Sequence, residues 1–283
     1  MQAAGLRWHV QRMGVPAPHA PVVWLLHGTG AATHSWRGLM PLLAPHCQVL
    51  AADLPGHGFT AMPGEGAHSA QLSLPGMAHA LHALMQAMDA VPDLVVGHSA
   101  GAAIAVRMCL DGHIAPKAVV SLNGAFLPLG GLAGQFFSPV AKLMASAPFV
   151  PRLFAWHASD PSVLQRLLAS TGSALDPTGQ ALYGQLVRSP GHAAGALAMM
   201  ANWDLPSLAR DLPSLQTPLC LAVGSNDRTI PPVQAQRVLA LLPPHPQTVV
   251  TTLAGLGHLA HEERPDLIAQ LVMRVARDAG LVA

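Results

Sequence analysis

The stretch Gly97-His98-Ser99-Ala100-Gly101 decides how this chain folds. A short apolar run, residues 94–96, precedes it, and a mostly apolar stretch, residues 102–108, follows it. This order predicts a strand, a sharp turn and a helix, which is the arrangement of a G-x-S-x-G nucleophile elbow. We expect the turn to expose the Ser99 hydroxyl. It should also bring strand and helix so close that side chains in place of the two glycines would clash.

Outward from this stretch, apolar runs typical of buried strands alternate with segments of helical spacing. Strands are expected over residues 6–13, 22–26, 48–52, 118–122, 219–223 and 248–253, and helices over 74–90, 232–242 and 261–279. Between them, residues 124–203 hold helix-like pieces separated by glycine and proline, with no strand pattern. The sequence therefore predicts an α/β core made of residues 1–123 and 204–283, with a helical lid inserted at 124–203.

The composition is unusually apolar, with 51% hydrophobic and only 10% charged residues. Soluble domains usually carry about 25% charged residues, so we expect an apolar surface patch or a large apolar cavity. A general drift toward alanine, leucine and proline would explain the same numbers. The net charge is +1 and the only lysines are Lys117 and Lys142, which argues against nucleic acid as a partner.

The three cysteines, Cys47, Cys109 and Cys220, have no metal-binding or redox spacing and suggest a reducing compartment. The first residues lack the apolar core of a signal peptide, and no segment reads as a membrane span. The sequence therefore predicts a cytoplasmic protein. Its apolar composition also permits peripheral contact with a membrane.

Three polar residues follow separate predicted strands in the order serine, aspartate, histidine. Ser99 would be the nucleophile, His258 the general base, and Asp227 the acid that orients His258. Asp204 and Asp211 are weaker candidates for the acid, because neither follows a strand. Asn123 does follow one, but an amide cannot act as the anion.

An oxyanion hole needs two backbone N–H groups beside the nucleophile. Ala100, at the start of the helix after the elbow, would supply one. The loop after the strand at residues 22–26 would supply the other, from Thr29 or from the alternative Gly28. His27 and His98 are expected to brace the backbone rather than to take part in chemistry.

Sixteen histidines raise the question of a metal site. His79 and His82, and also His258 and His261, are spaced three apart, but no pair has an evident third ligand. We expect no metal and no cofactor. Large apolar side chains in and near the predicted lid are candidates to line a substrate pocket, although packing between lid and core would explain them equally well: Phe126, Phe136, Phe137, Met144, Phe154, Trp156, Met199, Met200 and Trp203.

Taken together, the segments HGTG, DLPGHG, GHSAG, SNDRTIPP and GLGHLAHEERP resemble the α/β-hydrolase superfamily in order and spacing. This resemblance implies a mostly parallel, eight-stranded sheet flanked by helices. Stretches such as LSLPGMA, SLNGAFLPLGGLAG and GHAAGALAMMANWDL, which include the lid, are similar to the magnesium-chelatase accessory protein family of bacteriochlorophyll biosynthesis. That similarity implies a role near magnesium insertion into protoporphyrin, with chelatase subunits as partners, close to the photosynthetic membrane.

Two functions from different classes follow. The first is a serine hydrolase that acts on a hydrophobic ester or related acyl compound, such as a tetrapyrrole ester. The second is a non-catalytic porphyrin-binding protein that presents its ligand to magnesium chelatase. Magnesium insertion needs no serine nucleophile, which favours the second, whereas a complete set of Ser99, Asp227 and His258 favours the first.

Overall fold

A computed structural model describes residues 1–16, 20–128, 147, 149–157 and 160–283 of the chain. Within these ranges the centre of the molecule is a seven-stranded sheet with the strand order β3-β5-β4-β6-β7-β8-β9, in which only the edge strand β3 runs antiparallel to its neighbour. The strands are β3 (Val10–Gly14), β4 (Val22–Leu26), β5 (Gln48–Ala52), β6 (Leu94–His98), β7 (Ala118–Leu122), β8 (Leu219–Gly224) and β9 (Val250–Leu253).

The mostly parallel sheet flanked by helices confirms the predicted fold class. Where the sequence predicts one strand over residues 6–13, the structure has β2 (Leu6–Arg7) and β3. Strand β2 pairs with β1 (Gln2–Ala3) in a separate two-stranded sheet. The main sheet therefore has seven strands in the described part of the chain, against the eight that the resemblance implied.

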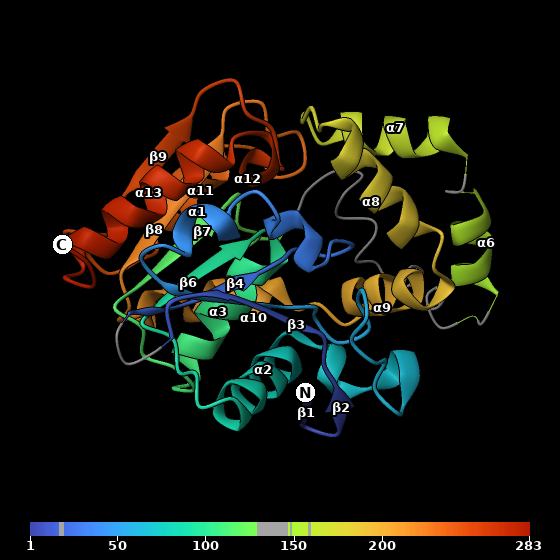
Figure 1. Cartoon of the computed structure of the whole chain (residues 1–283), viewed down its shortest axis with the longest axis horizontal. Coiled ribbons are helices and arrows are strands. Elements are labelled where there is room, and N and C mark those ends of the chain that lie inside the picture. The colour runs from blue at the N-terminus through green and yellow to red at the C-terminus, as the bar shows by residue number, and fades with distance from the viewer. Residues whose placement is uncertain (17–19, 129–146, 148, 158–159) are drawn as a thin grey trace.

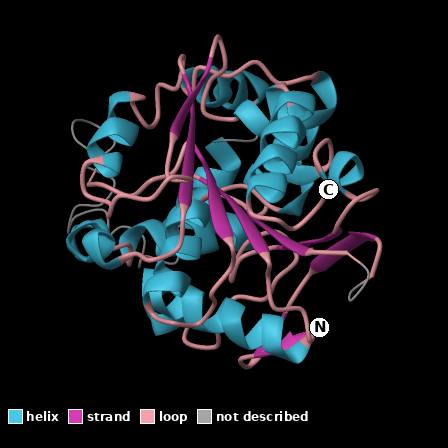
Figure 2. Cartoon of the chain, turned by 90° about the vertical axis from the view of Figure 1, so that its left-hand side faces the viewer, coloured by secondary structure: helices cyan, strands magenta, loops and turns pink. Residues whose placement is uncertain are grey.

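The sheet is covered on both faces, as Figure 2 shows. Its strands are therefore apolar on both sides, and alternate side chains enter different cores. In β4, Trp24 and Leu26 pack into one apolar cluster, whereas Val23 and Leu25 pack into the other. The first cluster includes α2 (Leu74–Ala87) and α3 (Ala100–Leu110), and the second includes α1 (Met40–Leu43) and α13 (Pro265–Asp278).

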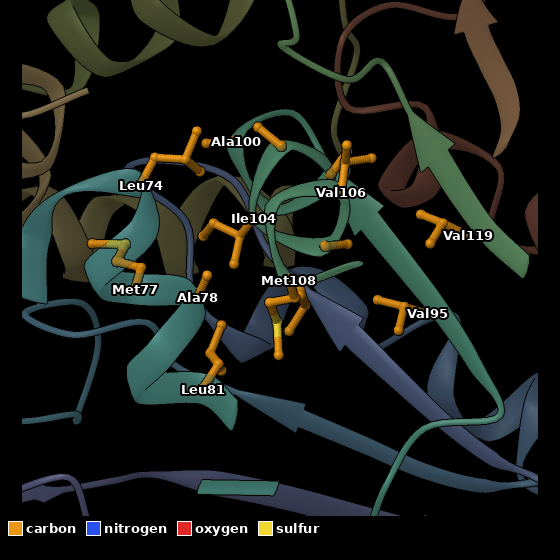
Figure 3. Packing of buried hydrophobic residues seen from close by; sticks show 14 of the residues in the cluster. Leu74, Met77, Ala78, Leu81, Val95, Ala100, Ile104, Val106, Met108 and Val119 are labelled. Atoms are coloured by element: carbon orange, nitrogen blue, oxygen red, sulfur yellow. The ribbon is translucent and has the colours of Figure 1, made fainter. Parts of the chain in front are cut away.

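Helices α2 and α3 form the part of the core that lies under the elbow. Ser73 begins α2 by accepting a hydrogen bond at Oγ from the Gly76 N–H, at 3.2 Å. In Figure 3, Leu81 of α2 and Ile104 of α3 lie where the two helices meet, and Val95 and Val119 of the sheet lie on the other side of α3. Truncating one of these fully buried side chains to alanine would cost about 2–5 kcal/mol of stability.

The described residues between β7 and β8 form helices and no strand. Helices α6 (Val150–His157), α7 (Pro161–Ser170), α8 (Pro177–Val187) and α9 (Pro190–Ala201) gather at one side of the sheet, whereas α10 (Leu205–Asp211) lies next to α3 (Figure 1). Three of them begin where an aspartate or serine precedes a proline: Asp160, Asp176 and Ser189 accept a hydrogen bond from the first turn. Proline fits there because the first N–H groups of a helix have no partner within it.

The C-terminal region differs from the sequence prediction at one point. A single helix was expected over residues 261–279, but the structure has α12 (Ala260–Glu263) and then α13. The break falls at Arg264, because Pro265 has no N–H to donate and disfavours helical backbone in the residue before it. Helix α11 (Val233–Leu239) lies between β8 and β9. None of the helices in the described ranges is long and apolar enough to cross a membrane.

The strand order fixes where a site can form. Strand β5 lies on one side of β4, and β6, which follows later in the chain, lies on the other side of β4. A crevice opens at such a reversal, beyond the carboxyl ends of the strands. The loops that leave β4, β6, β7, β8 and β9 all start at this edge of the sheet.

Candidate active site

Ser99 occupies a strained turn between β6 and α3. Its backbone angles are φ 51° and ψ −116°, a region that residues other than glycine rarely adopt. Hydrogen bonds to the segment that follows β7 hold it there: the Ser99 N–H donates to the Leu122 carbonyl at 3.0 Å, and the Ala125 N–H donates to the Ser99 carbonyl at 3.1 Å. The surrounding backbone therefore determines the conformation at Ser99.

The two glycines of the elbow permit close approach of neighbouring backbone. A Cβ atom on Gly97 would lie 2.5 Å from the Ala102 nitrogen, and one on Gly101 would lie 2.1 Å from the Leu26 carbonyl oxygen. Both distances are far below van der Waals contact. The expected clash at positions 97 and 101 is confirmed.

His258 and Asp227 are brought together from the loops that follow β9 and β8. The His258 Nδ1 lies 2.8 Å from Asp227 Oδ2, and the other carboxylate oxygen accepts from the N–H groups of Thr229 and Ile230 at 2.7 and 2.8 Å. The Asp227 side chain is fully buried. A carboxylate oxygen can only accept here, so His258 donates from Nδ1–H to Asp227, and Nε2 is the ring nitrogen that can accept a proton.

The backbone of His258 is fixed by two side chains. Its carbonyl oxygen accepts from His98 Nε2 at 2.9 Å and from Asn123 Nδ2 at 2.7 Å. Burial lowers the pKa of His98 well below its usual 6.5, so the ring is neutral and donates through Nε2. The rings of His98 and His258 lie 4.7 Å apart, centroid to centroid, which places His258 beside the neighbour of Ser99. His98 thus braces the backbone, as expected.

The loop after β4 lies directly against the elbow, since a Cβ atom on Gly28 would be 3.0 Å from Ser99 Cβ. The Gly28 carbonyl accepts from the Ala31 N–H at 3.2 Å and from His27 Nδ1 at 2.8 Å. His27 Nε2 in turn accepts from the Leu54 N–H at 2.9 Å, and burial lowers the pKa of His27 to about 3. His27 is therefore a neutral brace for this loop, as its position in the sequence suggested.

These bonds also orient the next N–H group. A trans peptide is planar, with its C=O and N–H pointing in opposite directions. Holding the Gly28 carbonyl therefore aims the Thr29 N–H away from His27. Neither this N–H nor that of Ala100 meets an acceptor within the described residues. Two backbone donors beside Ser99 are thus available.

The turn between α7 and α8 contacts the loops of both His258 and Asp227, which the sequence did not reveal. The Thr171 carbonyl accepts from the N–H of Arg228 at 3.3 Å and from that of His258 at 3.2 Å. Ser173 Oγ accepts from the Leu259 N–H at 2.8 Å. Gly172, between these two residues, lies so close to the loop of Asp227 that a Cβ atom on it would be 2.0 Å from the Asn226 carbonyl oxygen.

The weaker candidates for the acid have other partners. Asp204 caps α10 by accepting from the Ser207 N–H at 3.1 Å, and Asp211 pairs with Arg107 at 2.7 Å. Asn123 lies between the loops of Asp227 and His258, as a hydrogen-bond donor and acceptor. The carboxylate that bonds to the His258 ring is that of Asp227.

The residues suggested as pocket lining fall into different environments. Phe126 and Trp203 are buried in the cluster that also contains Ala100, and Met200 is half-buried. Trp156 is 73% exposed, so most of its side chain faces solvent. Phe136, Phe137 and Met144 lie outside the described residues, as does the side chain of Phe154.

The histidines give no metal centre in the described ranges. No group of three or more histidine, cysteine, aspartate or glutamate side chains there is arranged to hold an ion. His82 instead stacks on His113, with ring centroids 4.9 Å apart, and His79 lies edge-on to the same ring.

Comparison with known proteins finds similar sequences. The model of the alpha/beta hydrolase family matches residues 23–271. The magnesium-chelatase 30 kDa subunit of Rhodobacter capsulatus is 35% identical over 253 residues, which cover 89% of this chain and 86% of that protein.

Solved structures share the fold at lower identity. An alpha/beta hydrolase fold protein from Burkholderia ambifaria superposes with a TM-score of 0.77 and 22% identity, covering 95% of this chain and 94% of the other. A thermophilic esterase from Thermogutta terrifontis gives a TM-score of 0.71, also at 22% identity, with 97% and 94% coverage. At this identity, the likeness concerns the fold alone.

Proposed function

Because the chain belongs to the alpha/beta hydrolase family, we propose that it is a serine hydrolase with Ser99 as nucleophile, His258 as general base and Asp227 as the orienting acid. One observation carries the proposal: His258 Nδ1 bonds to a fully buried Asp227 carboxylate, and the His258 ring packs against that of His98, the residue before Ser99 in the strained elbow. Strained backbone and a buried charge both cost stability. A site that combines them is typical of catalysis.

In the proposed reaction, His258 Nε2 takes the Ser99 proton as Oγ attacks the acyl carbon. The developing oxyanion accepts hydrogen bonds from the N–H groups of Ala100 and Thr29, or of Gly28 in place of Thr29. Asp227 stabilises the imidazolium, which then protonates the leaving group. Water, activated by the same His258, releases the acid and restores the Ser99 hydroxyl.

We further propose that residues 124–203 form a lid over the site, inserted into a core of residues 1–123 and 204–283. Phe126, Met200 and Trp203 would lie along an apolar pocket. Trp156 is left out of this pocket because of its exposure. Apolar lining of this kind favours a hydrophobic ester, thioester or related acyl compound, such as a tetrapyrrole ester.

A second candidate function rests on the relative from Rhodobacter capsulatus, which is named as a subunit of magnesium chelatase and is similar over 86% of its length. Under this reading the protein binds a porphyrin in the same pocket and presents it to chelatase subunits without using Ser99. Contact with pigment-synthesising membranes belongs to the same proposal, and co-sedimentation with anionic lipid vesicles would test it.

Turnover of p-nitrophenyl esters of increasing chain length tests the hydrolase proposal. We expect activity that rises with acyl length and falls by at least about 10³-fold in Ser99→Ala. Ser121→Ala is the matched control, because Ser121 is a buried serine on β7 whose Oγ has no hydrogen-bond partner in the described part of the chain. Ester turnover that survives in Ser99→Ala would rule out this site.

Complementation separates the two candidate functions. The gene is deleted in a strain that normally makes bacteriochlorophyll, and the deletion strain is then supplied with wild type or with Ser99→Ala. If hydrolysis is the cellular role, the variant fails to restore pigment although it folds. Full restoration by Ser99→Ala would favour the porphyrin-binding function.

A further inference from the structure

Helix α9 contacts the site through one of its faces. His192, Gly195 and Met199 are spaced by three and four residues, so they lie on the same side of the helix. His192 and Met199 are buried there. All three meet the loop after β4 or the loop after β5, and the loop after β4 lies against Ser99 and holds the proposed oxyanion donor Thr29.

His192 connects these two loops. Its Nδ1 accepts from the Gly58 N–H at 3.0 Å, and its Nε2 lies 3.1 Å from the Gly30 carbonyl oxygen, to which it donates. The imidazole can accept at one nitrogen and donate at the other only when it is neutral. Burial lowers the pKa of His192 and so favours this neutral form. The His57 and His192 rings pack nearly perpendicular to each other, with centroids 5.3 Å apart.

The close approach of α9 is built into the backbone. A Cβ atom on Gly195 would lie 2.0 Å from the Gly56 carbonyl oxygen, so only glycine permits the helix to come this near. One turn further along, Thr29 Oγ1 donates to Met199 Sδ at 3.3 Å. The helix is therefore fitted against both loops over two turns.

We propose that His192 is a positioning residue: it holds the loop of residues 27–31 so that the Thr29 N–H points at the developing oxyanion. His27 fixes the Gly28 carbonyl on one side of Thr29, and His192 fixes the Gly30 carbonyl on the other. With both neighbouring carbonyls held, the Thr29 peptide has little freedom to rotate. This inference rests on the proposed hydrolase function and adds a residue from the inserted segment to it.

The test compares His192→Phe, which keeps the ring but loses both hydrogen bonds, with His192→Gln. The amide of glutamine offers an acceptor and a donor on one carbon, as Nδ1 and Nε2 do. Ser189→Ala is the control on the same helix: it removes the Oγ that caps α9 but contacts neither loop. Thermal unfolding verifies that all three variants fold.

Two measurements are made on each variant. The first is kcat and KM on the best ester, together with the affinity for a trifluoromethyl ketone, which binds as an oxyanion adduct, and for the matching methyl ketone, which does not. In His192→Phe we expect kcat and trifluoromethyl ketone affinity to fall by about 10- to 100-fold, whereas KM and methyl ketone affinity change by less than about threefold. His192→Gln should recover part of the loss.

The second measurement is amide hydrogen exchange, which does not require activity. We expect faster exchange over residues 28–31 and 56–58 in His192→Phe but not in Ser189→Ala. Unchanged exchange there, or unchanged kcat and trifluoromethyl ketone affinity, would overturn the role of His192. If the wild type turns over no ester, the proposed function fails, and the exchange data still decide whether His192 holds the loop.

Discussion

The side-chain amide of Asn123 donates a 2.7 Å hydrogen bond to the main-chain carbonyl of His258. The same Nδ2 reaches the Gly257 carbonyl at 3.1 Å, while Oδ1 accepts from the Gly224 N–H at 2.7 Å. Asn123 is buried and has a left-handed backbone, with φ 49°. One side chain thus joins the strand end that leads to Asp227 and the loop that carries His258.

Asn123→Asp should reduce activity, because a carboxylate of nearly the same shape cannot donate to the two carbonyls and would be buried beside them. We expect kcat to fall by about 10- to 100-fold and the melting temperature to drop, as measured by ester turnover and calorimetry. Asn202→Asp is the control, since Asn202 Nδ2 also donates to two main-chain carbonyls, those of Ala67 and Ala198. An equal loss of kcat in both variants would contradict a specific role for Asn123.

Gly172→Ala should distort the loops of the proposed acid and base together. Position 172 has φ +80°, and the added Cβ would meet the Asn226 carbonyl oxygen at 2.0 Å. We expect a loss of about 1–3 kcal/mol in the free energy of unfolding and a lower kcat. Gly64→Ala provides the comparison, because its Cβ would meet nothing within 4 Å, and it should stay within about 0.5 kcal/mol of wild type. Wild-type kcat in Gly172→Ala would show that this turn does not position the site.

Glu262→Gln tests the buried contact between α8 and α12. The Tyr183 hydroxyl donates to Glu262 Oε1 at 2.7 Å, and burial raises the pKa of Glu262 from 4.5 to about 7. Between pH 4.5 and about 7 the folded protein keeps a proton on Glu262 that the unfolded chain has lost. The Glu262 carboxyl therefore lowers the free energy of unfolding progressively as the pH rises through this range. Glutamine is neutral at every pH and avoids this loss.

We therefore expect the melting temperature of Glu262→Gln to exceed that of wild type at pH 8, by about 4 °C, and to approach it at pH 5. Calorimetry at both pH values measures the difference. Glu65→Gln, at an exposed position, should show no such change. A melting-temperature difference between Glu262→Gln and wild type that does not vary with pH would contradict the buried, protonated state of Glu262.

Much of the fold follows from the sequence, because its strands are apolar on both faces and each is followed by a loop with polar residues. The run before Gly97 and the placement of Asp227 and His258 after their own strands are local patterns of this kind. The break between α12 and α13 was missed although Pro265 marks it. The starts of α7, α8 and α9 are signalled in the same way, by a capping residue before proline.

The contacts from the helices between β7 and β8 could not be predicted. His192 acts through a loop more than 130 residues away, and the Thr171 carbonyl meets two loops that are distant in sequence. Such contacts depend on how α7, α8 and α9 pack on the core, and helical periodicity does not specify that packing. In the sequence alone, a histidine that is buried in the fold and bridges two backbone groups cannot be distinguished from any other histidine.

The central claim, that Ser99 is an activated nucleophile, is tested most directly by fluorophosphonate labelling followed by mass spectrometry of the intact and digested protein. The account predicts one adduct per chain, located on Ser99, formed in the wild type and in Ser121→Ala but absent in Ser99→Ala and strongly slowed in His258→Ala. Folded wild-type protein that takes up no label, or that carries it on another residue, would contradict the claim.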